Sequence, residues 1–452
     1  MPIAGPMFAE LGIGIGAGIV GTWLASRASD TSAAAFALGN HVAAMLFILF
    51  RIVGAGAGVV IAQHAGAGRF TEANAVTRAI LGASTAMGVV TALGAVLGAA
   101  TLMQWMNAPA DVAPLAASFL VVLAPALFVD AWAASLSSAL RARLVNRAVL
   151  GVTLISTTLQ MALAVPLMLG AGSFEGLGLT GFAAAQFAGR AVAVIALLAI
   201  ARHALALRTT WPDWWMLRPQ ALEPVLRIGL PGAAENIGYR LAFMVSLAAA
   251  GTLGAQALAA QAYTLQVSSA ALMFGLAIGL SMEIAIGHLA GAGKLHAADT
   301  LLRGGLKLAL ILSLAATALS ALLAPWTLPG FSADASILRD AHLLLWLTVL
   351  LEPGRTFNLV VINALRACGD ARFPVIAGIA SMVLILAGGS WVFAVVLGWG
   401  LTGIWIAYIA DEWCRGILMW LRWRSHAWVA HVRRSRRWAA ASVRHQSSSQ
   451  NK

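Results

Sequence analysis

Charged residues are scarce in this 452-residue chain. Only 10% of the residues are Asp, Glu, Lys or Arg, whereas 60% are hydrophobic, and the mean hydropathy is +0.86. Soluble proteins carry about 25% charged residues, so this composition excludes an ordinary soluble domain. So few charges among so many apolar residues are typical of a protein that crosses the membrane several times.

Catalytic and metal-binding patterns are also absent. The two cysteines, Cys368 and Cys414, have no partner at the spacing of a disulfide framework or a metal site. None of the nine histidines lies in a zinc-binding helix motif, and no Gly-Lys-Ser/Thr loop that would cradle a phosphate is found. We therefore expect no enzyme, no metal and no cofactor, and we exclude ATP-driven pumping by this chain.

Long apolar stretches recur along the chain, separated by short polar breaks. Stretches of about 20 residues are long enough to cross a hydrocarbon core of about 30 Å. The pattern predicts an all-α membrane protein with twelve transmembrane helices, at roughly 7–26, 32–62, 79–105, 113–138, 149–170, 179–201, 228–250, 257–287, 306–328, 341–365, 374–397 and 403–421. The second and eighth spans are long and rich in glycine, which predicts a tilt or a kink there.

The chain also contains an internal repeat. Three segments recur at an offset of 225 residues and a fourth at 222: Ile61–Gly68 as Ile286–Gly293, Pro6–Glu10 as Pro231–Glu235, Ser138–Ala142 as Asn363–Ala367, and Leu177–Gly181 as Trp399–Gly403. Tandem membrane halves are typical of transporters, which hold their cargo where the repeats meet. We therefore expect a six-helix lobe over 1–201, a cytoplasmic linker over 202–227, a second six-helix lobe over 228–421 and a basic tail over 422–452.

The 29 lysines and arginines are distributed asymmetrically. With a cytoplasmic N-terminus, and with Lys307 at the cytoplasmic end of its span counted as cytoplasmic, 22 of them fall in cytoplasmic segments, five within spans, and only Arg27 and Arg339 in outer loops. This asymmetry follows the positive-inside rule and predicts a multi-pass protein of the cytoplasmic (inner) membrane with both termini cytoplasmic. The net charge of +12 therefore indicates contact with anionic lipids at the inner leaflet, with no need for a nucleic-acid partner.

Charged residues within the predicted spans form the most informative polar set. A charge at mid-bilayer costs about 2.5–3.5 kcal/mol on insertion scales, so such residues are usually paired, exposed to water or functional. The set comprises Glu10, Asp130, Glu235, Glu283, Glu352, Asp411 and Glu412 together with Arg51, Arg190, Arg240, Arg355 and Arg415.

The repeat pairs several of these charges by position. Asp130 corresponds to Arg355 at the offset of 225, and Arg190 corresponds to Glu412 at the offset of 222. Opposite charges at corresponding positions predict structural or gating salt bridges, either across the pseudo-twofold seam or inside each lobe. Glu283, near the cytoplasmic end of its span, is interpreted as a gate or a loop anchor.

Four carboxylates are candidates for ion coupling or substrate binding: Glu10, Glu235, Glu352 and Asp411. Glu10 and Glu235 occupy corresponding positions, and no basic residue lies within one helical turn of either. A carboxylate in a low-dielectric environment can exchange protons near neutral pH, and it can also hold Na⁺ or a cationic guest. For Glu352 the alternative is a structural bridge to Arg355, one turn further along the same span.

Five segments between about residue 6 and residue 420 form an ordered set: Ile61–Gly68, Leu226–Pro231, Leu253–Ala260, Ile286–Gly293 and Leu365–Asp370. In sequence and order they resemble segments of the multidrug and toxic compound extrusion (MATE) family, within the wider multidrug/oligosaccharidyl-lipid/polysaccharide flippase superfamily. The resemblance implies two pseudo-symmetric six-helix lobes that form a V-shaped central cavity. It also implies secondary active export of organic, mostly cationic and aromatic compounds by antiport with H⁺ or Na⁺ through alternating access.

Two positions depart from the family pattern. Many members carry an aspartate fifteen residues after the proline of the first helix, where this chain has Gly21. Others carry a glutamate eight residues after the proline of the seventh helix, where this chain has Tyr239. The familiar cation sites therefore cannot be transferred, and another carboxylate must provide the coupling.

We therefore predict a multidrug efflux transporter that acts as a monomer, with small drug-like cations and membrane lipids as its partners. A flippase of a lipid-linked or amphipathic substrate in the same superfamily is the alternative. A lipid-pyrophosphate flippase would need a cluster of cavity-facing arginines, whereas the spans hold seven acidic residues and five arginines. An intramembrane enzyme would need a nucleophile–base or metal constellation, and the sequence contains none.

Overall fold

The computed structural model describes residues 3–106, 108–170 and 175–434, and this part of the chain is helical without a strand. It divides into two compact units. Unit 1 comprises the residues up to Ala65 and Arg69–Ala233, and unit 2 comprises Gly66–Gly68 and the residues from Ala234 onward. The boundary lies inside a helix, so the expected division into lobes and linker stays a prediction.

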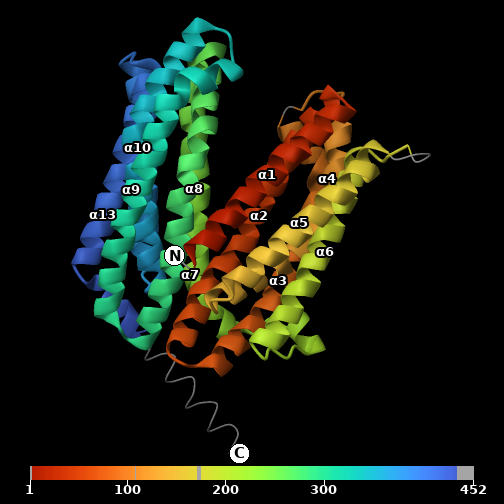
Figure 1. Cartoon of the computed structure of the whole chain (residues 1–452), viewed down its shortest axis with the longest axis vertical. Coiled ribbons are helices and arrows are strands. Elements are labelled where there is room, and N and C mark those ends of the chain that lie inside the picture. The colour runs from red at the N-terminus through yellow and green to blue at the C-terminus, as the bar shows by residue number, and fades with distance from the viewer. Residues whose placement is uncertain (1–2, 107, 171–174, 435–452) are drawn as a thin grey trace, which may run out of the picture. The chain divides into compact units, whose positions relative to one another are not determined.

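Unit 1 contains six whole helices and the first part of α7 (Pro219–Thr252). The six helices are coloured from red to yellow-green in Figure 1. The helices are α1 (Ala4–Ala28), α2 (Asp30–Gly66), α3 (Phe70–Trp105), α4 (Ala113–Ala142), α5 (Asn146–Leu169) and α6 (Leu179–Ala204). Helix α4 packs on α3 and α6, and α5 packs on α1 and α6. A core of apolar side chains from all six helices, including Phe36, Phe119 and Phe182, holds the bundle together.

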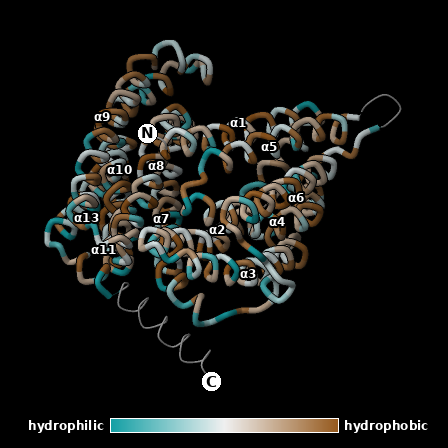
Figure 2. Tube along the Cα trace, turned by 60° about the horizontal axis from the view of Figure 1, so that its bottom comes forward, coloured by the Kyte–Doolittle hydropathy of each residue, from teal (hydrophilic) through white to brown (hydrophobic). Residues whose placement is uncertain are grey.

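Unit 2 repeats this plan with the second half of the chain, coloured from green to blue in Figure 1. Its helices are the second part of α7 (Pro219–Thr252), α8 (Ala255–Ala292), α9 (Leu295–Thr327), α10 (Ala335–Ala367), α11 (Arg372–Ser381), α12 (Gly389–Trp391) and α13 (Gly400–Arg424). Helix α10 is central, because it packs on α8, α9 and α13. In Figure 2 the helices are mainly apolar along their length, and hydrophilic residues gather at the loops and helix ends.

Each of the twelve predicted spans lies on a helix, but hydropathy alone supports fewer crossings. Nine described helical spans are long and apolar enough to cross a membrane, and the bent α2 makes up to ten. The other two predicted spans lie on α7 and α13, which fall short because charged side chains lower their hydropathy. Helix α13, for example, carries the three charged residues Asp411, Glu412 and Arg415 in its middle part. Charged residues inside a membrane helix are candidates for a functional role.

The repeated glycine-rich segment ends a long helix in the same way in both halves. Gly68 and Gly293 hold equivalent positions after α2 and α8, and both adopt a left-handed conformation with φ of 75° and 76°. The next amide donates back to the carbonyl five residues earlier, at 2.9 Å from Arg69 to His64 and 2.8 Å from Lys294 to Leu289. This is the Schellman arrangement, which favours glycine because a side chain is strained there.

The glycine-rich stretch of the second span allows close helix packing. A Cβ atom on Gly56 would lie 2.0 Å from the carbonyl oxygen of Val225, and one on Gly229 would lie 1.8 Å from that of Ile52. Helices α2 and α7 therefore cross at these two glycines, as small-residue contacts in membranes allow. The predicted kink is confirmed for the second span, because α2 bends by 44° between Thr31–Phe47 and Ile52–Gly66. Helix α8 runs unbroken.

The eleventh span contains π-helical turns that hydropathy does not predict. They cover Met382–Gly388 and Val392–Val396, with the short α12 between them. Such turns leave the regular hydrogen-bond ladder and occur frequently at functional sites. Ser381, directly before the first of them, donates a hydrogen bond to Asp411 on α13.

The linker and the beginning of the tail form compact aromatic contacts. In the linker, Trp211 is 75% exposed, whereas the ring of Trp214 packs edge-on against Trp132 of α4 at 5.0 Å between centroids. After α13, Trp428 stacks on Trp423 at 4.3 Å. The part of the predicted basic tail over 435–452 lies outside the described residues.

Candidate ion-coupling and cargo sites

The two symmetry-related glutamates near the start of each half have arginine partners on another helix. Arg141 of α4 donates to Glu10 of α1 at 2.5 Å, and Arg366 of α10 donates to Glu235 of α7. Both pairs span 131 residues and hold equivalent positions in the two units. These partners are not predicted by neighbours on the same helix, because each arginine lies 131 residues away on another helix. A signal was nonetheless present, since both arginines lie in the repeated Ala-Leu-Arg-Ala segment.

The other charges at corresponding positions are paired inside their own units. Asp130 of α4 lies 3.3 Å from the Nε of Arg190 on α6 in unit 1. In unit 2 the Nε of Arg355 on α10 lies 3.2 Å from Glu412 on α13. The two pairs are equivalent, with acid and base exchanged between the units. Of the two predicted alternatives, the structure shows ion pairs within each unit, and their structural or gating role stays a prediction.

The pair in unit 2 belongs to a larger buried cluster on α10 and α13. Arg355 also contacts Glu352, one turn earlier, so the local bridge predicted as an alternative is formed too. Arg415 lies 2.9 Å from Glu412 and donates two hydrogen bonds to Asp411, at 2.7 and 3.0 Å. Two neutral side chains also donate hydrogen bonds to these carboxylates: Asn358 to Glu412 at 3.1 Å and Ser381 to Asp411 at 2.7 Å.

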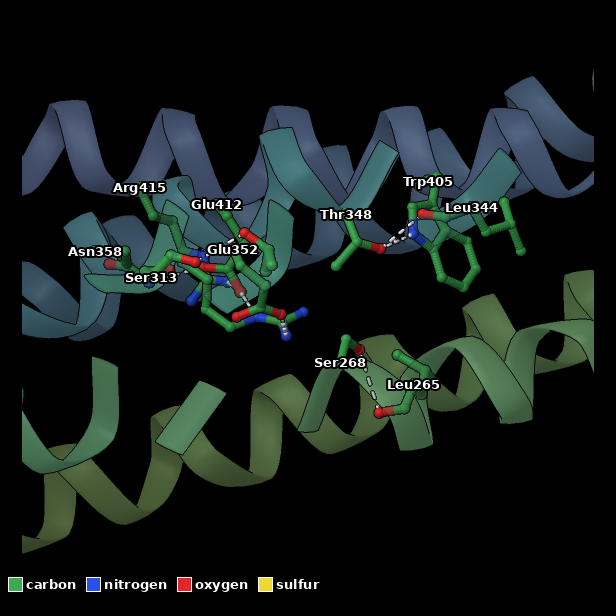
Figure 3. A network of polar contacts seen from close by, with 12 residues as sticks. Leu265, Ser268, Ser313, Leu344, Thr348, Glu352, Asn358, Trp405, Glu412 and Arg415 are labelled. Carbon is green, nitrogen blue, oxygen red and sulfur yellow. Dashed lines mark hydrogen bonds and ion pairs between the residues drawn. The ribbon is translucent and has the colours of Figure 1, made fainter. Parts of the chain in front are cut away.

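This cluster, defined by Glu352, Arg355, Asp411, Glu412 and Arg415, is not neutral. Three carboxylates face two guanidinium groups, so the formal charge is −1 when all five are ionised. Glu352 is only 1% exposed, and its Oε2 makes no hydrogen bond with any described residue. Figure 3 shows Glu352 beside Glu412 and Arg415. A net buried charge is expensive, so the cluster is a candidate site for one proton or one small cation.

Tyr239 of α7 lies beside this cluster. The guanidinium carbon of Arg415 is 6.0 Å from the centre of the tyrosine ring, within the range of a cation–π contact. The position where other members carry a glutamate therefore faces the buried charges. A tyrosine there supplies a ring in place of a fourth carboxylate.

Gly21, the other position that departs from the family pattern, is enclosed by aromatic rings. A Cβ atom there would lie 2.8 Å from the ring of Phe36 and 3.1 Å from that of Phe182. These two rings meet edge to face with their centroids 4.8 Å apart. An aspartate side chain would displace at least one ring, so unit 1 has an aromatic wall in place of the familiar carboxylate.

The same rings line a pocket of about 820 Å³ in unit 1, between α1, α2, α5 and α6. Trp23 adds a third aromatic wall, and neutral amides and hydroxyls such as Gln160 and Thr157 complete much of the lining. Arg190 of the Asp130 pair also lines it. Ligand sites typically have this size and combine apolar walls with a few polar groups.

The remaining candidate, Glu283, lies half-buried on α8. Its role as a gate or loop anchor stays a prediction, as do the roles of the other charged residues in transport.

Comparison with known proteins agrees with this architecture of two repeated helical halves. The MatE family matches residues 6–166 and 231–391, one match in each half. The uncharacterized transporter YisQ of Bacillus subtilis (strain 168) is 32% identical over 424 residues, which cover 94% of this chain and 93% of the relative. The probable multidrug resistance protein NorM of Agrobacterium fabrum is 25% identical over 401 residues, which cover 84% of each chain.

Solved structures share the fold. The Vibrio cholerae MATE transporter VcmN in its bent form matches with a TM-score of 0.86 and 17% identity, covering 96% of this chain and 97% of that one. The repeat, the buried charges and these likenesses define a multi-pass membrane transporter that is not an enzyme. The chain belongs to the MatE family.

Proposed function

We propose that this chain is a secondary active transporter of the inner membrane that exports small organic compounds in exchange for H⁺ or Na⁺. Membership of a family that includes multidrug resistance proteins supports export of small molecules. The observation that carries the coupling is the buried five-residue cluster of unit 2 with its formal charge of −1. Binding one cation makes the cluster neutral, so its ion occupancy can be linked to the conformation of the protein.

Within the cluster, Glu352 is the carboxylate that we assign to the coupling ion. Asp411 accepts hydrogen bonds from Arg415 and Ser381, and Glu412 is bonded by Asn358 and Arg355. Among the described residues, Glu352 forms an ion pair with Arg355 alone, and its buried Oε2 has no hydrogen-bond partner. That free oxygen can accept a proton, or ligate Na⁺, without breaking an existing hydrogen bond.

Glu10 and Glu235 are weaker candidates for coupling in this geometry. Each forms a close pair with one arginine, and each pair is neutral by itself. Protonating either glutamate would leave a guanidinium unpaired inside the bundle, which opposes uptake of a proton. We propose that these two equivalent pairs hold the first helix of each half against the fourth.

The test is transport by the purified protein in vesicles under separately imposed proton and sodium gradients. A fluorescent organic cation and a fluorescent carboxylate of similar size serve as cargo in parallel. We expect one of the gradients to drive export of at least one compound, and Glu352→Gln to abolish this while the protein still inserts. Glu223→Gln is the matched control, because Glu223 is 55% exposed in a surface pair with Arg227. Gradient-driven export that survives Glu352→Gln would refute the assignment.

The predicted flippase activity finds less support in this geometry. Pyrophosphate recognition calls for several convergent guanidinium groups, whereas Arg190 is the only arginine among the described residues that line the unit 1 pocket. The aromatic part of the predicted cargo suits the pocket better, because Trp23, Phe36 and Phe182 offer flat apolar surfaces.

We also propose that both termini are cytoplasmic, as the positive-inside rule predicts. The equivalent turns after α2 and α8 then lie on the cytoplasmic side. In a cysteine-free background, Arg69→Cys and Lys294→Cys should react with an impermeant maleimide only when the inner face is accessible. Labelling of either from outside would contradict this orientation.

A further inference from the structure

The described lining of the unit 1 pocket carries a basic side chain and no acidic one. No carboxylate occurs among its described lining residues, and Arg190 is its single permanently charged side chain. A second guanidinium lies close by, because Arg27 stacks over the ring of Trp23 at 5.1 Å. An organic cation would find no counter-charge on these walls.

Arg190 also has unused hydrogen-bonding capacity. Its side chain is 34% exposed, and none of its five N–H donors forms a hydrogen bond with a described residue. The contact of its Nε with Asp130, at 3.3 Å, is electrostatic only, because the Nε lacks a hydrogen-bond partner. A guanidinium group with free donors at a pocket wall is suited to a planar carboxylate, which it can hold through two parallel bonds.

The remaining walls suit a flat aromatic body. The rings of Phe36 and Phe182 meet edge to face beside the groove, and Trp23 is half-exposed toward it. Gln186 lies one helical turn before Arg190 on α6 and also lines the pocket, so it adds a neutral donor near the guanidinium. The pocket therefore combines the aromatic surfaces of its walls with the guanidinium group of Arg190.

We propose that this pocket binds aromatic monocarboxylates, with the carboxylate on the free edge of Arg190 and the ring system against Trp23, Phe36 and Phe182. The inference rests on the proposed function, because it takes the pocket as a cargo site. It departs from the family expectation of cationic cargo. One carboxylate matches the site better than a phosphate, because Asp130 already neutralises part of the charge on Arg190.

The experiment measures binding to the purified full-length protein in detergent by calorimetry, with three ligands of one ring system. These are 2-naphthoate, its neutral amide, and the corresponding aminomethyl cation. We expect the parent to bind naphthoate more tightly than the cation. Because hydrogen bonds to charged groups contribute about 1.5–3 kcal/mol, Arg190→Gln should weaken naphthoate binding about tenfold to a hundredfold and leave the amide nearly unchanged.

Two further variants separate recognition from folding. Asp130→Asn removes the carboxylate that competes for Arg190, so naphthoate should bind more tightly than to the parent. A merely structural Arg190 would not produce that gain. Where Arg190→Gln alone unfolds the protein, the double variant Asp130→Asn/Arg190→Gln contains no buried unpaired charge and should fold, yet lack the preference for naphthoate.

The proposal is overturned if the parent prefers the cation, if it does not bind naphthoate, or if the folded double variant binds naphthoate like the parent. Transport separates this result from the proposed function. Gradient-driven export of a cation without naphthoate binding would refute the aromatic-carboxylate site alone. Naphthoate binding as described, without gradient-driven export of any compound, would refute antiport and leave the pocket as a binding site.

Discussion

Loss of the Arg355 side chain should strongly destabilise unit 2. It contacts both Glu352 and Glu412, which are 1% and 4% exposed, so its removal leaves three buried carboxylates with one guanidinium. Breaking a buried ion pair by removing one partner typically costs about 3–5 kcal/mol. Arg355→Ala should therefore lower the melting temperature of the purified protein sharply. Arg227→Ala, which breaks a surface pair on one helix, should cost about 0.3–0.5 kcal/mol.

The identity of the second substitution that restores stability tests this reasoning. Among the described residues, Glu352 has only Arg355 as an ion-pair partner, whereas Glu412 keeps Arg415 and Asn358. Glu352→Gln should therefore rescue Arg355→Ala more than Glu412→Gln does, although both return the cluster to its original formal charge. Equal rescue, or rescue by Asp130→Asn in the other half, would refute the partner assignment. A thermal-shift measurement on the four variants decides between these outcomes.

Three further predictions concern separate parts of the molecule. Glu10→Gln should lower the melting temperature because Arg141 loses its partner, and the double variant with Arg141→Gln should recover it; no recovery would mean that the pair is not the source of the loss. Gly229→Ala should reduce the yield of folded protein, since its Cβ would lie 1.8 Å from a carbonyl oxygen of α2, whereas Gly151→Ala, which meets nothing within 4 Å, should be tolerated. Burial is the largest single influence on the pKa of Asp213 in the linker, and it raises that pKa. Hydrogen bonds from the N–H and hydroxyl of Thr210, together with the charges of Arg218 and Arg78, lower the pKa by more, so it lies below its usual value. Because the pKa of Asp213 is lower in the folded state, its ionised carboxylate stabilises the fold above about pH 3.9, the usual pKa of an aspartate. This stabilisation is lost as the pH falls through the pKa of the folded state. The parent should therefore melt at a higher temperature than Asp213→Asn at pH 7, and this gap should close in acid; a gap that is independent of pH would contradict the ionised role.

Much of the architecture could be predicted from the sequence because it depends on local chemistry. Apolar stretches of sufficient length form helices in a membrane, since every backbone group must be hydrogen-bonded within its own segment. The glycines that end α2 and α8 were visible as a repeated pattern, and their conformation follows from the absence of a side chain. The bridge between Glu352 and Arg355 was predictable too, because residues three apart lie on the same face of a helix.

The partners of Glu10 and Glu235, the contact of Arg355 with Glu412 on another helix, and the aromatic enclosure of Gly21 required the tertiary structure. Each depends on how helices far apart in sequence are rotated and crossed. Asp130 and Arg355 occupy corresponding positions in the repeat. Corresponding positions fix where each residue lies in its own half, but they do not determine which residues it contacts. Packing within each unit instead paired Asp130 with Arg190 and Arg355 with Glu412, because a short-range ion pair forms only between side chains that the helix contacts bring within a few ångströms.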